Sequence, residues 1–376
     1  MSPRISTFTD TYLPTVNGVT YSIQLWKQRW NSSQTYPGRM TVTYPGSDDY
    51  DPDDDEIPVR SFDFPFYEGY RIGVPGPTLP SESRQADLVH VHSPFSMGIA
   101  GAGLARYSDL PLVASYHTPI PKYIEYLTSN DAVARRLQKV SQVWERRYLS
   151  QTDIVIVPSD EAGDELASKG VDDDKIRVLS NGVDTEFFRP VESNLLSEIG
   201  AEPPVAGYCG RHGYEKNLRD AVDAADRLPE IDFVLVGDGP ARDSLIEYAD
   251  SRDIDNVYFP GFLERDRLPD FYSSLDVFVF PSDVETQGIV ALEATACGTP
   301  VVGADAGGLR NSIDEGRNGL RYSPGDVDAF VDRIRETFDR RDSLSENSLR
   351  MRDEIDVGST LNDLAEIYDS LVPSQI

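Results

Sequence analysis

The chain of 376 residues has only two cysteines, Cys209 and Cys297, and no long apolar run. Two cysteines form no disulfide framework, and both lie in apolar stretches, so we expect buried free thiols. A membrane-spanning helix needs at least about 18 consecutive apolar residues, so the sequence predicts no such helix. The first residues lead into an expected strand without a signal peptide, which predicts a cytoplasmic protein.

Basic residues are scarce as well. The 35 lysines and arginines face 64 aspartates and glutamates, which gives a net charge of −29 at pH 7. So large a negative charge argues against nucleic acid as the main partner. Either a halophilic source, with a cytoplasm near multimolar salt, or a cationic partner would explain it. The acidic residues are spread along the whole chain and lysine is scarce beside arginine, which favours the halophilic explanation.

Apolar runs of strand length alternate with helical patterns from end to end. The expected strands are Ile5–Thr9, Met40–Tyr44, Leu88–Val91, Leu112–Tyr116, Ile154–Val157, Ile176–Leu179, Val205–Cys209, Phe233–Val236, Val257–Phe259, Val277–Phe280 and Val301–Gly303. Strands separated by helices are typical of parallel α/β sheets, and these are too many for one ordinary doubly wound sheet. The sequence therefore predicts two Rossmann-like domains at 1–183 and 205–357, joined by a polar, proline-containing linker at 184–204.

The stretch Leu275–Asp305 reads as strand, loop, helix, turn and strand, and it places two carboxylates around a helix start. Glu285 lies in the loop, and Glu293 lies about one turn inside the helix that Gly288 opens. The free N–H groups of a helix start are a natural seat for a phosphate. A carboxylate accepts two hydrogen bonds side by side, so each glutamate suits a vicinal diol. This arrangement suits a nucleotide-sugar.

A second segment, Gly207–Leu218, leads from a strand through a glycine-bearing loop into a helix. It contains Arg211 and Lys216. Two cations at the carboxyl end of a strand, in so acidic a chain, favour neutralisation of a diphosphate, on which charge accumulates as a glycosidic bond breaks. The alternative is an ordinary salt bridge, with Glu215 or Asp220 as the partner.

Together these segments resemble family 4 of the glycosyltransferases, the retaining, two-domain group 1 type with the GT-B fold. The likeness rests on the Glu-x7-Glu pattern of Glu285 and Glu293, on GR(x)4K, and on GTPVVGADAGGLRNSI. Four N-terminal segments, FTDTYLPTVNGVTYSI, DLVHVHSPF, SYHT and LSNGVDTEFFRP, follow in the family's order, so the resemblance covers nearly the whole chain. It implies two domains that face each other across a deep cleft. The first binds the acceptor and carries a C-terminal helix, 358–376, and the second binds the nucleotide-sugar.

The resemblance also implies roles for individual residues. The expected catalytic residues are His117, Glu285, Arg211 and Lys216. The expected donor-binding residues are Asn17, Gly18, Arg211, Lys216, Gly261, Phe262, Leu263, Glu285, Gly288, Ile289, Val290 and Glu293. Within this set, Arg211 and Lys216 would hold the diphosphate, Glu285 the sugar hydroxyls and Glu293 the ribose, with the base near Gly261–Leu263.

The histidines differ in their expected use. His117 follows a strand and precedes Thr-Pro, which is an active-site position, and the resemblance implies that it meets the donor sugar or the acceptor hydroxyl. His90 and His92 alternate with valines on a strand and share one face, which is typical of packing or of a cleft floor. The acidic stretch Ser47–Glu56 reads as a solvated loop. We expect no cofactor and no metal, because Arg211, Lys216 and the helix start would supply the metal's electrostatic effect.

The segment Lys122–Tyr148 is locally basic and also contains aromatic and aliphatic residues. Its basic residues are Lys122, Arg135, Arg136, Lys139, Arg146 and Arg147. A helix with basic and aromatic faces suits the surface of an anionic membrane. The alternative is a helix packed in the first domain with its charges solvated.

The resemblance is closest to the branch that glucosylates or mannosylates diacylglycerol-type lipids. It implies metal-independent transfer of a hexose from a UDP- or GDP-hexose to a membrane lipid or lipid-linked glycan. The protein would be cytoplasmic and peripheral on the inner face of the cell membrane. A soluble acceptor, such as a sugar phosphate or a compatible solute, and a scaffold that binds the nucleotide-sugar without transfer remain the alternatives.

Overall fold

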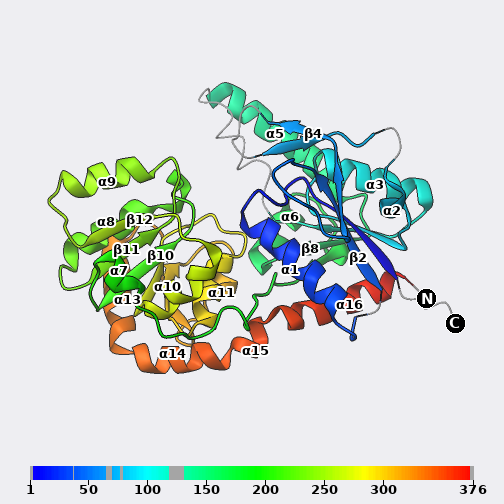
Figure 1. The fold of residues 1–376 in the computed structure, drawn as a ribbon. Helices are drawn as coiled ribbons and strands as arrows, with labels where there is room; N and C mark the ends of the chain where they lie inside the picture. The colour runs from blue at the N-terminus through cyan, green and yellow to red at the C-terminus, as the bar shows by residue number, and fades with distance from the viewer. Residues whose placement is uncertain (1–2, 37, 65–69, 77–78, 118–130, 373–376) are drawn as a thin grey trace. The chain divides into compact units, whose positions relative to one another are not determined.

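Figure 1 shows the computed structural model, which describes residues 3–36, 38–64, 70–76, 79–117 and 131–372. The chain divides into two compact units. Unit 1 consists of Met1–Asn181 together with Thr360–Ile376, and unit 2 consists of Gly182–Ser359. Each unit is built around its own parallel sheet, as the α/β prediction requires.

The sheet of unit 1 has seven strands in the order β3-β2-β1-β6-β7-β8-β9, and all neighbours are parallel. Its strands are β1 (Arg4–Phe8), β2 (Arg39–Pro45), β3 (Glu56–Val59), β6 (Leu88–Val91), β7 (Leu112–Ser115), β8 (Ile154–Val157) and β9 (Ile176–Val178). The strands β6, β7 and β8 are buried along their whole length, which explains their continuous apolar character. A separate antiparallel pair is formed by β4 (Ser61–Asp63) and β5 (Arg71–Gly73).

The helices of unit 1 lie between its strands, and some of them begin at polar side chains that accept hydrogen bonds from N–H groups of the first turn. They are α1 (Gly18–Ser32), α2 (Ser81–Arg84), α3 (Ser96–Ser108), α5 (Asp131–Leu149), α6 (Asp160–Ser168) and the 3-10 helix η1 (Asp173–Lys175). Asn17 caps α1, and the buried Asp10 accepts a hydrogen bond of 2.9 Å from the Met97 N–H at the start of α3. The last helix, α16 (Val357–Leu371), belongs to unit 1 from Thr360 onward and buries Tyr368 there.

The sheet of unit 2 has six parallel strands in the order β12-β11-β10-β13-β14-β15. They are β10 (Val205–Cys209), β11 (Asp232–Val236), β12 (Val257–Gly261), β13 (Val277–Phe280), β14 (Val301–Ala304) and β15 (Gly319–Tyr322). The helices are α7 (Leu195–Ile199), η2 (Tyr214–Lys216), α8 (Leu218–Arg227), α9 (Arg242–Asp250), η3 (Arg265–Arg267), α10 (Leu268–Ser274), α11 (Ile289–Ala296), α12 (Leu309–Ser312), α13 (Val327–Asp339), α14 (Arg341–Arg350) and α15 (Arg352–Ile355). The whole of the predicted linker, with α7 in it, therefore belongs to unit 2.

The strand order of unit 2 reverses between β10 and β13. From β10 the chain proceeds outward through β11 and β12, and from β13 it proceeds in the other direction through β14 and β15. The loops that follow β10 and β13 therefore leave the sheet side by side at its carboxyl edge. This reversal is the switch point at which open α/β sheets bind ligands.

Candidate active site

Lys216 and Glu285 form an ion pair at the switch point of unit 2. Lys216 ends η2, in the loop after β10, and Glu285 lies in the loop after β13. The Lys216 Nζ and the Glu285 Oε1 are 2.5 Å apart. The side chains are 20% and 14% exposed, so both remain partly accessible. Asn217 donates to Asp283 at 3.1 Å and ties the same two loops together. The fold thus brings two predicted catalytic residues into contact, where an entering hydroxyl or phosphate oxygen would meet a cation and an acceptor together.

Arg211 forms an ion pair of 2.5 Å with Glu215 in the loop after β10. This is the salt bridge that the sequence left open as an alternative. The Arg211 side chain is 38% exposed and its guanidinium has five donors, so the pair with Glu215 alone does not use up its capacity to bind an anion. A Cβ at Gly213 would lie 2.2 Å from the Glu215 carboxylate, so the glycine allows Glu215 to fold over the loop.

The helix α11 begins at Gly288, directly after the Glu285 loop. Gly288 has φ of +75°, which favours glycine, and a Cβ there would lie 2.4 Å from Leu309. No side chain caps this helix start. The half-buried Ile289 and Val290 follow in its first turn, where the N–H groups lack partners within the helix.

Two glycines that the sequence analysis did not single out hold the Glu285 loop in place. The Gly308 N–H donates to the Glu285 carbonyl at 2.7 Å. A Cβ at Gly307 would lie 2.5 Å from the Glu285 carbonyl oxygen, and a Cβ at Gly308 would lie 2.1 Å from the Thr286 carbonyl oxygen. The consecutive glycines in ADAGGLRN were the available signal, because such close backbone approach requires them.

Glu293 lies inside α11 and is only 6% exposed. The Tyr272 hydroxyl donates to its Oε2 at 2.7 Å. Burial raises the pKa of the Glu293 carboxyl, against the lowering effects of Arg265 and of the Tyr272 hydrogen bond. One carboxylate oxygen is therefore already engaged within unit 2, and the ribose role of Glu293 stays a prediction.

The three residues predicted near the base lie at the same carboxyl edge of the sheet. Gly261 ends β12 with φ of +87°, Phe262 is 61% exposed, and Leu263 packs against the core. An exposed phenylalanine beside an anchored leucine offers an apolar surface at the end of a strand. The predicted donor residues of unit 2 thus follow β10, β12 and β13.

Asn17 and Gly18 lie in unit 1 at the start of α1. The Asn17 side chain accepts from the Thr20 N–H at 2.9 Å and donates to the Thr11 hydroxyl at 2.8 Å. Asn17 therefore has a structural function as a helix cap. Gly18 is exposed. Their predicted approach to the diphosphate stays a prediction.

His117 lies just after β7 in unit 1 and is buried beside His92, which follows β6. The His117 Nε2 and the His92 Nδ1 are 2.8 Å apart. His90 instead contacts the Tyr368 hydroxyl at 2.7 Å and the Ser115 hydroxyl at 2.8 Å. Burial lowers the pKa of His117 to about 4 and that of His90 to about 3. All of these contacts lie within unit 1.

The acidic stretch Ser47–Glu56 is less uniform than a solvated loop. Glu56 is buried, and its carboxylate contacts the buried Lys27 ammonium at 2.7 Å. The hydroxyls of Tyr12 and Tyr50 each donate to Glu56 at 2.8 Å. The last acidic residue of the stretch therefore anchors it to the unit 1 core.

The part of the basic segment that the structure describes lies on α5, with side chains described from 135 onward. The five basic candidates Arg135, Arg136, Lys139, Arg146 and Arg147 are exposed. Four apolar side chains of the same helix, Leu137, Val140, Val143 and Trp144, are 40%, 62%, 61% and 39% exposed. Lys122 lies outside the described residues. The helix thus presents apolar and basic side chains together to solvent.

Within the described ranges, no group of three or more histidine, cysteine, aspartate or glutamate side chains is placed to hold a metal ion. Among the helices of the same ranges, none combines the length and the apolar character needed to cross a membrane. Both cysteines are buried free thiols.

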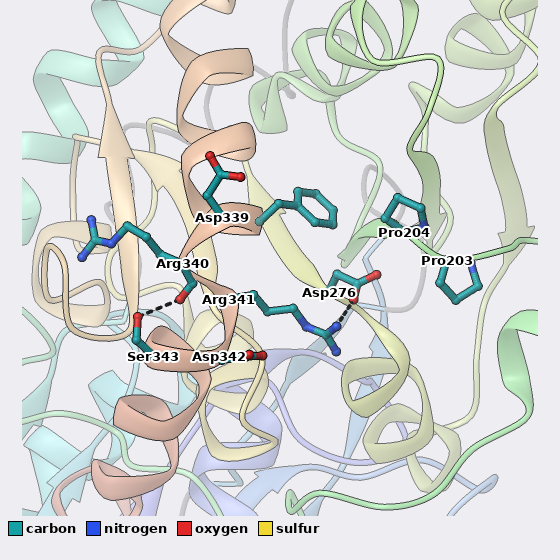
Figure 2. A pocket seen from close by; sticks show the side chains of 9 residues that line it. Pro203, Pro204, Asp276, Asp339, Arg340, Arg341, Asp342 and Ser343 are labelled. Carbon is teal, nitrogen blue, oxygen red and sulfur yellow. Dashed lines mark hydrogen bonds and ion pairs between the residues drawn. The ribbon is translucent and has the colours of Figure 1, made fainter.

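Figure 2 shows a pocket of about 580 Å³ at the opposite edge of the unit 2 sheet. Its lining includes Pro204, directly before β10, and Asp276, directly before β13. Arg341, at the start of α14, lies 2.5 Å from Asp276 across it (Figure 2). The residues predicted to bind the donor do not line this pocket, and open α/β sheets bind ligands at the carboxyl edge, so we do not assign the donor to it.

Comparison with known proteins agrees with this assignment of the fold. A family model described as Glycosyltransferase Family 4 matches residues 38–187, and one described as Glycosyl transferases group 1 matches residues 197–353. The structure of Anabaena HepE in complex with UDP superposes with a TM-score of 0.76 at 20% identity and covers 98% of this chain and 100% of that chain.

Three curated relatives resemble the chain in sequence. Sulfoquinovosyl transferase SQD2 of Arabidopsis thaliana is 34% identical over 76% of this chain, which spans 57% of the plant protein's length. Alpha-monoglucosyldiacylglycerol synthase of Streptococcus pneumoniae is 31% identical, covering 85% of this chain and 75% of the relative. A GDP-mannose-dependent alpha-mannosyltransferase of Corynebacterium glutamicum is 30% identical, covering 84% and 76%. The chain therefore belongs to the group 1, family 4 glycosyltransferases, with the GT-B fold, and the predicted enzyme class is confirmed.

Proposed function

We propose that the protein transfers a hexose from a UDP- or GDP-hexose to a membrane lipid or a lipid-linked glycan, with retention of configuration and without a metal. The observation that carries the donor half of this proposal is the contact between Lys216 and Glu285 at the switch point of unit 2. The family supplies the reaction class. The relatives named for GDP-mannose and the structural neighbour bound to UDP support the two candidate donors.

The chemistry that we propose follows from the charges. Lys216 and Arg211 stabilise the diphosphate as the bond from the anomeric carbon to it breaks. The bond to the acceptor oxygen forms on the same face of the sugar, and the acceptor's proton passes to the leaving phosphate oxygen. Glu285 accepts hydrogen bonds from the sugar hydroxyls and orients the ring. Two cations and a helix start supply the charge stabilisation that a divalent metal provides in other enzymes.

The lipid acceptor is supported by α5. Four half-exposed apolar side chains on one helix are costly to leave in water. Together with the five exposed cations of the same helix, they suit the interface of an anionic membrane. The relative named for monoglucosyldiacylglycerol synthesis supports the same acceptor class. We therefore propose a peripheral position on the inner face of the cell membrane.

The first test is the melting temperature of the purified protein in KCl with EDTA, in the presence of UDP, GDP, UDP-glucose or GDP-mannose. A ligand at about 100 times its dissociation constant stabilises by roughly 2.7 kcal/mol, which is a readable shift. Stabilisation by one nucleotide without metal supports the donor half. No shift with any of them contradicts it.

The second test is transfer of labelled hexose from the stabilising donor to vesicles that contain diacylglycerol and anionic lipid. A labelled lipid supports the proposal. Transfer to glucose phosphate in solution but not to the vesicles would favour the soluble-acceptor alternative, and donor binding without any transfer would favour the scaffold.

A further inference from the structure

His92 and His117 are buried histidines of unit 1 that contact each other. Both rings lie at the carboxyl ends of neighbouring parallel strands, β6 and β7. The His92 Nδ1 and the His117 Nε2 are 2.8 Å apart, and the two rings are inclined by only 10° with centroids 5.1 Å apart. The contact is thus a well-formed hydrogen bond between two imidazoles.

Both rings are enclosed. His92 is 5% exposed and His117 is 9% exposed. The indole of Trp26 lies edge-on at 5.9 Å from His92, and the His90 ring lies 4.2 Å away on the same strand. Burial lowers the pKa of His117 to about 4 and also lowers that of His92, so both imidazoles are neutral near pH 7.

A neutral imidazole carries one N–H, so a single proton lies between these two nitrogens. If the proton is on His92 Nδ1, then His117 Nε2 accepts it and the His117 Nδ1 is a donor. If the proton is on His117 Nε2, then the His117 Nδ1 is an acceptor. The tautomers of the two histidines are therefore coupled through this hydrogen bond, and the protonation of the His92 Nδ1 is linked to whether the His117 Nδ1 donates or accepts.

We propose that His92 is a positioning residue that fixes the tautomer and the ring orientation of His117 for its encounter with the donor sugar or the acceptor hydroxyl. The proposal rests on the proposed function, because the substrate that His117 is expected to meet is the hexose donor or the acceptor of that reaction. The pairing of the two histidines itself does not depend on that function.

His90 provides the matched control. It lies on the same strand, two residues from His92, and is 0% exposed. Its two ring nitrogens contact the Tyr368 and Ser115 hydroxyls and not His117. Its replacement therefore removes an equally buried imidazole without removing the hydrogen bond to His117.

The experiment compares the wild type with His92→Leu, His92→Asn and His90→Asn, each first shown to melt cooperatively. The tautomer of His117 is read from the ¹⁵N chemical shifts of the imidazole rings. The chain has only four histidines, so these signals are simple to assign. We expect the His117 tautomer populations to change in His92→Leu and to stay as in the wild type in His90→Asn. Asparagine places a polar group near the former Nδ1, so His92→Asn should restore part of the wild-type pattern.

The kinetic readout is hexose transfer from UDP-glucose or GDP-mannose to vesicles that contain diacylglycerol. We expect His92→Leu to lower kcat by about 10- to 100-fold, the scale of a misplaced catalytic group, with a much smaller change in the donor KM. His92→Asn should recover part of kcat.

Three results overturn the proposal. The first is an unchanged His117 tautomer in His92→Leu, which decides the question even if the wild type transfers no hexose and the proposed function fails. The second is a wild-type kcat in His92→Leu while the wild type is active. The third is an equal loss of kcat in His90→Asn, which would assign the effect to packing.

Discussion

Lys216 is the cation that the fold brings closest to a second predicted catalytic residue, Glu285. We expect Lys216→Ala to lower kcat by about 100- to 1000-fold, because a preorganised cation that stabilises the leaving diphosphate is lost. The measurement is hexose transfer at saturating donor. Arg227→Ala is the control, since Arg227 pairs with the exposed Asp328 at the end of α8 and its loss should leave kcat unchanged. A near wild-type rate for Lys216→Ala would refute the role of Lys216.

Lys27 and Glu56 give a prediction about stability and pH. Burial alone would raise the pKa of Glu56, but hydrogen bonds from Lys27, Tyr50 and Tyr12 outweigh it and lower the pKa. Because the pKa of Glu56 is lower in the folded state, the pair stabilises the fold fully at pH values above the unfolded-state pKa of about 4.3. This contribution is lost as the pH falls through the folded-state pKa. We expect Lys27→Met to cost roughly 3–5 kcal/mol at neutral pH, because it leaves a buried carboxylate without its cation.

Urea unfolding at pH 7 and at pH 4 measures this effect. The difference in unfolding free energy between the wild type and Lys27→Met should be smaller at the lower pH. Arg350→Met removes an ion pair whose two side chains are 62% and 66% exposed, and it should change the unfolding free energy by no more than about 1 kcal/mol. Equal stability of the wild type and Lys27→Met would show that the buried pair contributes nothing.

The grouping of single residues was predictable from the sequence where a motif contains them. Glu285, Arg211 and Lys216 were named as one group, and the structure brings Lys216 and Glu285 into contact. The sequence also put His90 and His92 on one face of a strand. It did not reveal the His92 contact with His117, because that contact depends on β6 and β7 being neighbours, and strand order is a long-range property that local patterns do not encode.

At the scale of elements, α5 carries the prediction on membrane binding. We expect Val143→Asp to weaken binding to anionic vesicles by about tenfold or more, since an exposed valine that enters the interface contributes roughly 1.5 kcal/mol or more and a carboxylate is repelled by the lipid charge. Vesicle sedimentation at increasing lipid concentration measures it.

Tyr107→Asp is the matched control for α5. Tyr107 is 92% exposed near the end of α3, eleven residues after Ser96 at the start of that helix. The replacement therefore adds a negative charge to unit 1 on a different helix from α5. It should have little effect on sedimentation. If both variants lose binding equally, general charge repulsion and not α5 would be responsible.

The predictable elements were those with continuous apolar runs. The strands β6, β8, β10 and β13 have the predicted bounds, because buried parallel strands read as unbroken apolar stretches. Four strands were missed: the short antiparallel pair β4 and β5, and two edge strands of the parallel sheets. Of the edge strands, β3 contains a proline and begins at the last residue of the acidic stretch, and β15 is a short GLRY segment with a half-buried arginine. Edge strands have only one paired side and tolerate such residues, so their sequences resemble loops.

The whole molecule has a net charge of −29, and its self-repulsion opposes compactness. Raising KCl from about 0.1 M to about 1 M shortens the Debye length from about 10 Å to about 3 Å, which should weaken that repulsion. We therefore expect the melting temperature to rise with KCl, as the halophilic explanation of the charge requires. Scanning calorimetry at several KCl concentrations measures it. A melting temperature that falls over this range would contradict that explanation.

The pairing of Lys216 with Glu285 and of Arg211 with Glu215 has a consequence for donor affinity at high salt concentration. Each cation already has an internal counterion, so the loops after β10 and β13 present a locally neutral surface instead of a strong positive field. In the proposed binding mode, a diphosphate would exchange partners with these carboxylates at short range, and few ions would need to leave the surrounding solution. Short contacts of this kind are little affected by ionic strength, so the proposed site would retain a donor at salt concentrations that would abolish attraction to an open cluster of cations.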